Sequence, residues 1–152
     1  MGSATNVVRQ TTVTAGALEQ ARRVLDLESA AIAQLHERLG AEFLKAVEMI
    51  GQCQGRVVVT GMGKSGLIGR KLAATFASLG VPAFFLHPAD GAHGDVGMVA
   101  RGDMLLAVSN SGETEEILRL LPIINNRFGL KLIAITGNPR STLAKRSDST
   151  FT

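Results

Sequence analysis

Short, continuous apolar runs alternate with longer stretches of helical spacing from Arg56 onward. The runs lie at residues 57–59, 83–86, 105–108 and 132–135. Their length and their bulky or β-branched composition indicate strands that are buried on both faces. Residues 67–79 and 113–128 between them are helix candidates, with Gly80 and Gly129 placed to end them. Strand alternating with helix predicts an α/β fold, a doubly wound parallel sheet of about five strands with flanking helices.

The remaining segments are less regular. Residues 90–99 are expected to form a loop with a helical turn. A turn at residues 137–139 precedes a short helix candidate at residues 141–146. Residues 149–152 look like the start of a further strand that is cut off, so we expect a fragment of a longer domain.

The first third of the chain has a helical pattern. Apolar residues recur every seven positions, at Leu18, Leu25, Ile32 and Leu39. Gly40 interrupts this stripe, and a second helical stretch covers residues 43–50. The stripe either packs on its own domain or packs against a partner subunit, and the spacing alone leaves both open. Residues 1–13 are expected to be a disordered or tag-derived N-terminus, and residues 14–152 the folded domain.

Two glycine- and hydroxyl-rich loops directly follow apolar runs. The first is Gly-Met-Gly-Lys-Ser-Gly at residues 61–66, and the second is Ser-Asn-Ser-Gly-Glu-Thr at residues 109–114. A glycine-rich turn between a strand and a helix gathers free backbone N–H groups at a helix N-terminus, which favours an anion. The hydroxyls and Lys64 suit a phosphate better than a carboxylate. A phosphorylated small molecule is therefore the expected ligand.

Two nucleotide-binding motifs resemble the first loop but do not fit. Gly61, Gly63 and Gly66 match the spacing of the dinucleotide fingerprint, which also needs an acidic residue at the end of the next strand. The first acid there is Asp90, after His87-Pro88. Val58 stands where a Walker motif requires glycine. We therefore expect neither a nicotinamide dinucleotide nor a P-loop nucleotide, and no cofactor.

The hydroxyls of the second loop have two interpretations. Helix capping by Asn110 or Ser111 would explain one of them. It would not explain Ser109, Ser111 and Thr114 together beside a loop of similar chemistry. Phosphate binding is the favoured interpretation.

Candidate acid–base groups follow both loops. Glu113, Glu115 and Glu116 begin the expected helix, where acids offset the macrodipole. Three carboxylates would also repel a phosphate, so we expect at least one to have a chemical use. Glu116 can project along the pocket as a general base. His93, in a glycine-rich loop, has room to face a ligand as a proton shuttle, whereas His36 and His87 are expected to be surface and structural residues.

The composition argues against membrane-spanning, secreted, nucleic-acid-binding and metal-dependent proteins. The chain has 152 residues, 45% of them apolar, which is enough for one core, and it has no run long enough to span a membrane. A signal pattern is absent and the single Cys53 cannot form an internal disulfide, so a cytoplasmic protein is expected. The net charge is +3 and there is no Trp or Tyr, so we expect no nucleic-acid partner. No histidine or cysteine pair has the spacing of a required metal site.

Three motifs in order resemble the sugar isomerase (SIS) domain of bacterial arabinose-5-phosphate isomerases. They are residues 58–78 around the first loop, residues 87–98 with Ala-His-Gly-Asp at 92–95, and residues 109–117. The resemblance implies a flavodoxin-like strand order and a tetramer. It implies catalytic roles for Lys64, His93 and Glu116, and phosphate binding by Gly63, Ser65, Ser109, Ser111 and Thr114. No metal is required, with His93 a possible ligand of an inhibitory metal.

The resemblance also implies that part of the family's usual chain is missing here. Typical members continue with a further strand, helices that carry another Glu and His of the active site, and two cystathionine-β-synthase-type (CBS) repeats. They often have Glu where this chain has Asp90. We expect the chain to be a truncated SIS domain, for which inactivity on its own is one expected outcome.

The expected function is an aldose–ketose isomerase that interconverts D-ribulose 5-phosphate and D-arabinose 5-phosphate through an enediol. In the resembling family this reaction feeds 3-deoxy-D-manno-octulosonate synthesis for lipopolysaccharide or capsule. Two alternatives stay open. One is a non-catalytic, regulatory domain that binds a sugar phosphate. The other is an isomerase for a different phosphosugar, because phosphate loops do not read sugar stereochemistry.

Overall fold

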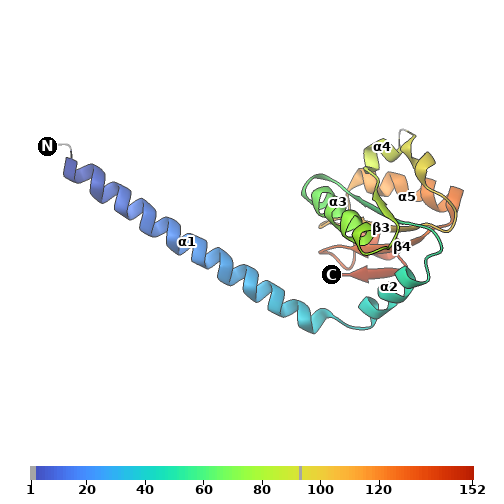
Figure 1. Ribbon diagram of the computed structural model, residues 1–152, viewed down its shortest axis with the longest axis horizontal. Helices are drawn as coiled ribbons and strands as arrows, with labels where there is room; N and C mark the ends of the chain where they lie inside the picture. Colours follow the sequence, from blue (N-terminus) through green and yellow to red (C-terminus); the bar gives the residue numbers. More distant parts are fainter. Residues whose placement is uncertain (1–2, 93) are drawn as a thin grey trace. The chain divides into compact units, whose positions relative to one another are not determined.

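The computed structural model describes residues 3–92 and 94–152 (Figure 1). The chain divides into two compact units, residues 1–39 and residues 40–152. The first unit consists of one helix, α1 (Ser3–Arg38). This helix includes the described part of the stretch expected to be disordered or tag-derived, since it runs through residues 3–13. Among the described residues no helix is both long and apolar enough to cross a membrane.

The second unit is built on a five-stranded parallel sheet. Its strands are β1 (Val57–Gly61), β2 (Ala83–Phe85), β3 (Met104–Val108), β4 (Lys131–Ile135) and β5 (Ser149–Phe151). The strand order is β2-β1-β3-β4-β5, and every neighbouring pair is parallel. This confirms the predicted α/β fold, with its doubly wound parallel sheet of flavodoxin-like order.

Helices cover both faces of the sheet. One face packs against α2 (Ala41–Gly51) and α3 (Gly63–Ser78). The other packs against α5 (Glu115–Phe128) and the single-turn helix α6 (Thr142–Arg146). The expected loop at residues 90–99 contains two short helices, α4 (Pro88–Ala92) and η1 (Asp95–Met98). In Figure 1 the sheet lies between these helices.

The apolar runs are continuous because each strand supplies both cores. Val57 and Val59 of β1 enter the core beneath α2 and α3, whereas Val58 enters the core beneath α5. All five residues of β1 and all five of β3 are buried. The edge strand β2 is only half-buried. The prediction of strands buried on both faces is therefore confirmed for the centre of the sheet.

An ion pair joins the amino ends of β1 and β3. Asp103 Oδ2 lies 2.9 Å from an Arg56 guanidinium nitrogen, and Asp103 Oδ1 accepts a hydrogen bond of 2.8 Å from the Arg56 N–H. The Ala100 N–H donates to the same carboxylate at 2.9 Å. Burial tends to raise the pKa of Asp103, but the hydrogen bonds from Arg56 and Ala100 outweigh it and hold the pKa below its usual value.

Two helices begin at positions other than those predicted. α3 begins at Gly63 instead of residue 67, so Lys64 and Ser65 lie in its first turn. α5 begins at Glu115 instead of residue 113. Gly112 has a positive φ of 65°, and the Glu113 carboxylate accepts a hydrogen bond from the Thr142 N–H. These two features hold residues 112 and 113 outside the helix.

Candidate functional site

The two glycine- and hydroxyl-rich loops lie side by side at the carboxyl edge of the sheet. β1 pairs with β3 so that Gly61, the last residue of β1, lies opposite Val108, the last residue of β3. The connection after β1 leads outward to β2, whereas the connection after β3 leads toward β4 on the other side. The strand order therefore reverses between β1 and β3, which is where parallel α/β sheets bind their ligands.

The first loop is a very tight turn into α3. A Cβ on Gly66 would lie 2.7 Å from the Gly61 carbonyl oxygen, and Gly63 has a positive φ of 53°. These glycines let the first helical turn sit directly on the end of β1. No side chain caps α3, so its first N–H groups are available to an anion. Lys64 is exposed and has no ion pair among the described residues, and Ser65 is half-buried.

The second loop is braced from inside by Ser109. Ser109 is 2% exposed, and its Oγ lies 2.7 Å from Thr114 Oγ1. The same oxygen accepts a hydrogen bond of 3.1 Å from the Gly112 N–H. Ser111 is exposed, and its Oγ accepts from the Glu113 N–H at 3.2 Å, which leaves its O–H free to donate. Ser109, which the sequence predicts as a phosphate-binding residue, has its hydroxyl engaged inside the loop and sets the loop's shape, while Ser111 is exposed.

The N-cap of α5 is Thr114, not Asn110 or Ser111. Its side chain makes no capping hydrogen bond, because the hydroxyl is directed to Ser109. Simple capping by Asn110 or Ser111 is therefore wrong as an account of this loop. The first turn of α5, like that of α3, retains uncapped N–H groups next to the strand-order reversal between β1 and β3.

The three glutamates after the second loop have different surroundings. Glu113 Oε1 accepts a hydrogen bond of 2.7 Å from the Thr142 N–H. Glu115 pairs with Arg119 one turn along α5. Glu116 is half-buried and has neither an ion pair nor a side-chain hydrogen bond among the described residues. Of the three carboxylates, Glu116 is the one that remains available for chemistry.

Helix α4 brings the segment after β2 to the same side of the sheet as Glu116. A Cβ on Gly91 would lie 3.0 Å from Leu120 Cδ1, so α4 packs closely on α5. Leu120 follows Glu116 by four residues and therefore lies one turn further along the same helix face. His93, the predicted proton shuttle and possible ligand of an inhibitory metal, lies outside the described residues.

Two polar atoms near the carboxyl edge are buried without a hydrogen-bond partner among the described residues: Thr60 Oγ1 and His87 Nδ1. Thr60 lies opposite Ala107, on the face of the sheet covered by α5. His87 packs edge-on against Phe85, and its Nδ1 lies 3.7 Å from Asp90 Oδ2. The sequence interpretation passed over Thr60, although a threonine that ends an apolar run was a signal for it.

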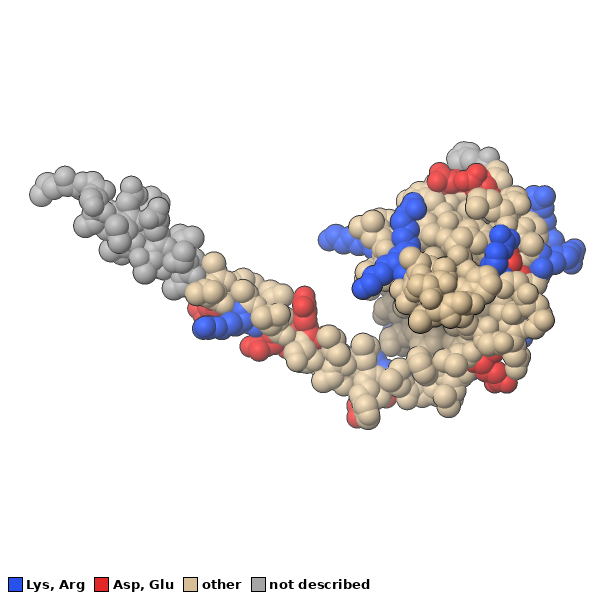
Figure 2. Space-filling view, in the orientation of Figure 1, with Lys and Arg blue, Asp and Glu red and all other residues tan. Residues whose placement is uncertain are grey.

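Metal-binding side chains do not gather at this edge among the residues that the structure describes. Among residues 3–92 and 94–152, no three His, Cys, Asp or Glu side chains are grouped so that they could hold a metal ion. On the face shown in Figure 2, Lys and Arg side chains of the second unit gather at its left and right sides, with mostly uncharged surface between the two groups.

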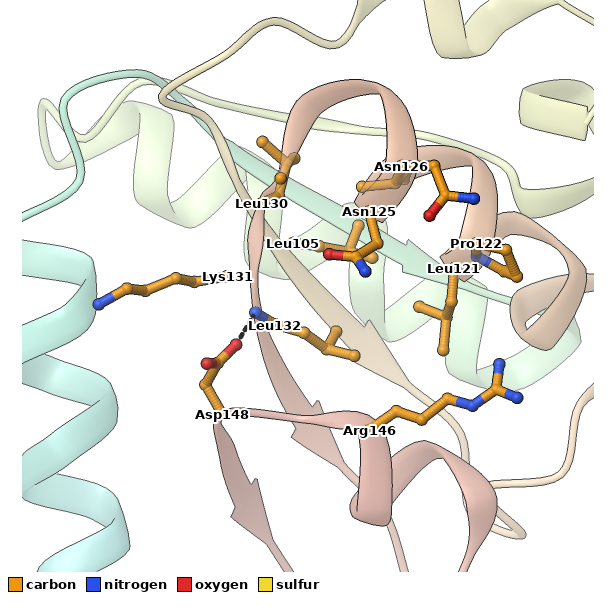
Figure 3. A pocket seen from close by; sticks show the side chains of 12 residues that line it. Leu105, Leu121, Pro122, Asn125, Asn126, Leu130, Lys131, Leu132, Arg146 and Asp148 are labelled. Carbon is orange, nitrogen blue, oxygen red and sulfur yellow. Dashed lines mark hydrogen bonds between the residues drawn. The ribbon is translucent and has the colours of Figure 1, made fainter.

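A pocket lies at the opposite edge of the sheet (Figure 3). It has a volume of about 640 Å³ and is lined by residues of α5, the start of β4 and the segment after α6. Leu105 and Leu132 belong to its apolar lining, Asn125 and Arg146 are among its polar residues, and Lys131 points away from the other side chains. This pocket holds neither loop, so it is not the candidate site.

Comparison with known proteins agrees with this architecture. Residues 50–152 match the SIS domain family. The chain belongs to the SIS domain family. It is 52% identical over 131 residues to arabinose 5-phosphate isomerase KdsD of Pseudomonas aeruginosa, covering 86% of this chain and 40% of that protein. The chain therefore spans about 40% of the length of the curated relatives that it matches.

Solved structures of SIS proteins superimpose closely on the chain. E. coli CFT073 c3406 in complex with arabinose 5-phosphate has a TM-score of 0.85 and 41% identity, covering 90% of this chain and 72% of that one. A putative phosphosugar isomerase involved in capsule formation from Bacteroides fragilis has a TM-score of 0.83 and 41% identity, covering 89% and 72%. At these identities and TM-scores the fold is shared.

Proposed function

We propose that this SIS domain binds D-arabinose 5-phosphate and D-ribulose 5-phosphate between β1 and β3 and interconverts them through an enediol. The observation that carries the proposal is the pair of uncapped, glycine-rich loops at the strand-order reversal, with the unpaired Glu116 directly beside them. The names of the relatives, which include arabinose 5-phosphate isomerases, support the sugar.

In this proposal the loops hold the phosphate and thereby fix the position of C1 and C2. The N–H groups of the first turns of α3 and α5, together with Gly63, Ser65, Ser111 and Thr114, bind the phosphate, and Ser109 holds the second loop in shape. Fixing one end of the sugar turns proton transfer into a positioned step.

The acid–base groups then act on the other end of the sugar. Glu116 takes a proton from C1 of the ketose and returns it to C2 of the enediol, which gives the aldose. His93 moves the hydroxyl protons or opens the sugar ring. Lys64 stabilises the developing oxyanion or binds the phosphate. The reaction needs no metal and no cofactor.

We also propose that the protein is a cytoplasmic homotetramer in which α1 forms the contact between subunits. Leu18, Leu25, Ile32 and Leu39 are exposed by 57–68%. Taken by itself, the first unit is one helix that cannot bury this stripe, so a second copy is a suitable cover. Cys53 is a free thiol, as suits a reducing compartment.

One experiment tests the proposed activity. The chain is mixed with D-ribulose 5-phosphate, and the formation of arabinose 5-phosphate is followed by NMR together with the line broadening of the ligand. Turnover is the expected result. Binding without turnover would favour a regulatory sugar-phosphate domain, and binding of another phosphosugar alone would favour an isomerase of different specificity. An absence of binding by any phosphosugar would contradict the site.

A further inference from the structure

The β3–α5 loop is hydrogen-bonded to the β4–α6 connection at both of its ends. At the strand end, the Gly137 N–H donates to the Asn110 carbonyl at 2.9 Å. At the helix end, the Leu143 N–H donates to the Gly112 carbonyl at 3.1 Å, and the Thr142 N–H donates to Glu113 Oε1 at 2.7 Å. Glu113 thus supplies the side-chain link between the two connections at the helix end.

The two connections also touch so closely that neither can shift alone. A Cβ on Gly112 would overlap Ser141 Oγ and would lie 2.8 Å from Thr136 Oγ1. Ser141 is itself fixed, because its Oγ accepts a hydrogen bond of 3.2 Å from the Ala144 N–H as the N-cap of α6. The position of the loop is therefore set by the first turn of α6.

The link also fixes the position of a carboxylate that stands near the proposed phosphate site. A free carboxylate in this loop would repel a phosphate. The hydrogen bond from the Thr142 N–H holds the pKa of Glu113 below its usual value and directs the carboxylate toward that N–H.

We propose that Glu113 is a positioning residue: by accepting the Thr142 N–H it holds the β3–α5 loop in the shape that receives the substrate phosphate. This inference rests on the proposed function, because it concerns the same site. It assigns Glu113 no contact with the sugar and no proton transfer. It predicts that breaking the link weakens phosphate binding while the acid–base chemistry persists.

The link can be broken from either side. Glu113→Ala removes the acceptor. Thr142→Pro removes the donor without touching the loop, and it suits the backbone, since Thr142 is the first residue of α6 and Ser141 is extended at ψ 162°. Glu113→Gln keeps an acceptor oxygen. Glu115→Ala is the matched control, because it removes a neighbouring carboxylate that pairs with Arg119 and not with the β4–α6 connection.

Binding of D-arabinose 5-phosphate to the chain is measured by titration calorimetry, with KM and kcat for the same variants where turnover is seen. We expect Glu113→Ala and Thr142→Pro each to raise Kd and KM about five- to tenfold, the loss of one charge-assisted hydrogen bond, with kcat changed less than about twofold. The double variant should bind no more weakly than either single variant. Glu113→Gln and Glu115→Ala should stay within about twofold of the parent chain.

Several results would overturn the inference. They are tighter binding by Glu113→Ala, parent-like binding by Thr142→Pro, or additive effects in the double variant. Hydrogen exchange of the Gly112 and Leu143 amides, measured without ligand, separates this inference from the proposed function. Unchanged exchange in both variants would overturn the link. A second outcome is faster exchange in the variants, combined with a parent chain that binds no phosphosugar. That outcome would overturn the proposed ligand, and with it a role of the link in binding.

Discussion

Glu116 is distinguished from its neighbours by what it lacks. Glu113 and Glu115 have partners at Thr142 and Arg119, whereas Glu116 has none among the described residues. We expect Glu116→Gln to remove turnover, because an amide cannot accept the proton from C1, a loss of at least about 100-fold. Binding of D-arabinose 5-phosphate should remain, since the phosphate loops are intact. NMR of one sample reads both quantities.

Glu115→Gln serves as the control for that variant, because it makes the same change one residue away. It should keep parent-like turnover. A Glu116→Gln variant that isomerises at the parent rate would remove Glu116 from the mechanism, and the general base would have to be sought elsewhere.

Gly112 and Gly129 separate the two costs of replacing a glycine. Both have nearly the same positive φ, 65° and 66°, but Gly112 faces Ser141 whereas nothing lies within 4 Å of a Cβ on Gly129. Gly129→Ala should cost about 1 kcal/mol of unfolding free energy, the strain of the left-handed conformation alone. Gly112→Ala should cost clearly more, because Ser141 must also move. Urea unfolding of the two variants compares them directly, and equal costs would show that the loop relaxes freely.

At the scale of elements, the amino ends of β1 and β3 depend on one buried carboxylate. The pKa of Asp103 is lowered on folding, so its contribution to stability is complete above the ordinary aspartate pKa of about 4 and is lost as pH falls through the lower value. We expect Asp103→Asn to destabilise the domain by about 2 kcal/mol at pH 7. The difference from the parent chain should shrink below about pH 4.

Thermal unfolding between pH 3 and pH 7 checks this expectation. The matched control is Asp95→Asn, an exposed acid at the start of η1 without an ion pair among the described residues. A destabilisation of Asp103→Asn that is independent of pH would show that the pair with Arg56 contributes through packing and not through charge.

Elements that depend on local pattern were predictable from the sequence, and elements that depend on distant partners were not. The runs at residues 57–59 and 105–108 are strands because their apolar character is continuous. The predicted start of α5 at residue 113 was wrong, because Glu113 accepts a hydrogen bond from Thr142, which lies 29 residues later in the sequence. For the same reason the sequence does not predict the ion pair of Asp103, because its partner Arg56 lies 47 residues earlier. Both glycine- and hydroxyl-rich loops could be located from the sequence because each is a local strand–turn–helix signal, whereas their binding of a phosphate stays a prediction.

At the scale of the whole molecule, α1 carries the prediction for assembly. Leu25 and Ile32 are 65% and 68% exposed on one stripe of the helix. We expect Leu25→Glu and Ile32→Glu together to lower the molar mass measured by light scattering, because charged side chains cannot be buried in a subunit contact. Ala30→Glu, on the far side of the helix by its 3.6-residue period, should leave the mass unchanged. Equal masses for all variants would remove α1 from the contact.

The division of the domain into two cores separates the two flanks of the proposed site. The helix behind the first glycine-rich loop, α3, rests on one face of the sheet, and the helix that carries Glu116, α5, rests on the other. The strands between them act as a partition, since neighbouring side chains of one strand belong to opposite cores. A repacked interior beneath α3 would shift the first loop and Lys64 while the core beneath α5 and Glu116 stays as it is, and the reverse would hold beneath α5. The two flanks of the proposed site can therefore drift apart in evolution, or be engineered apart, on one shared set of strands.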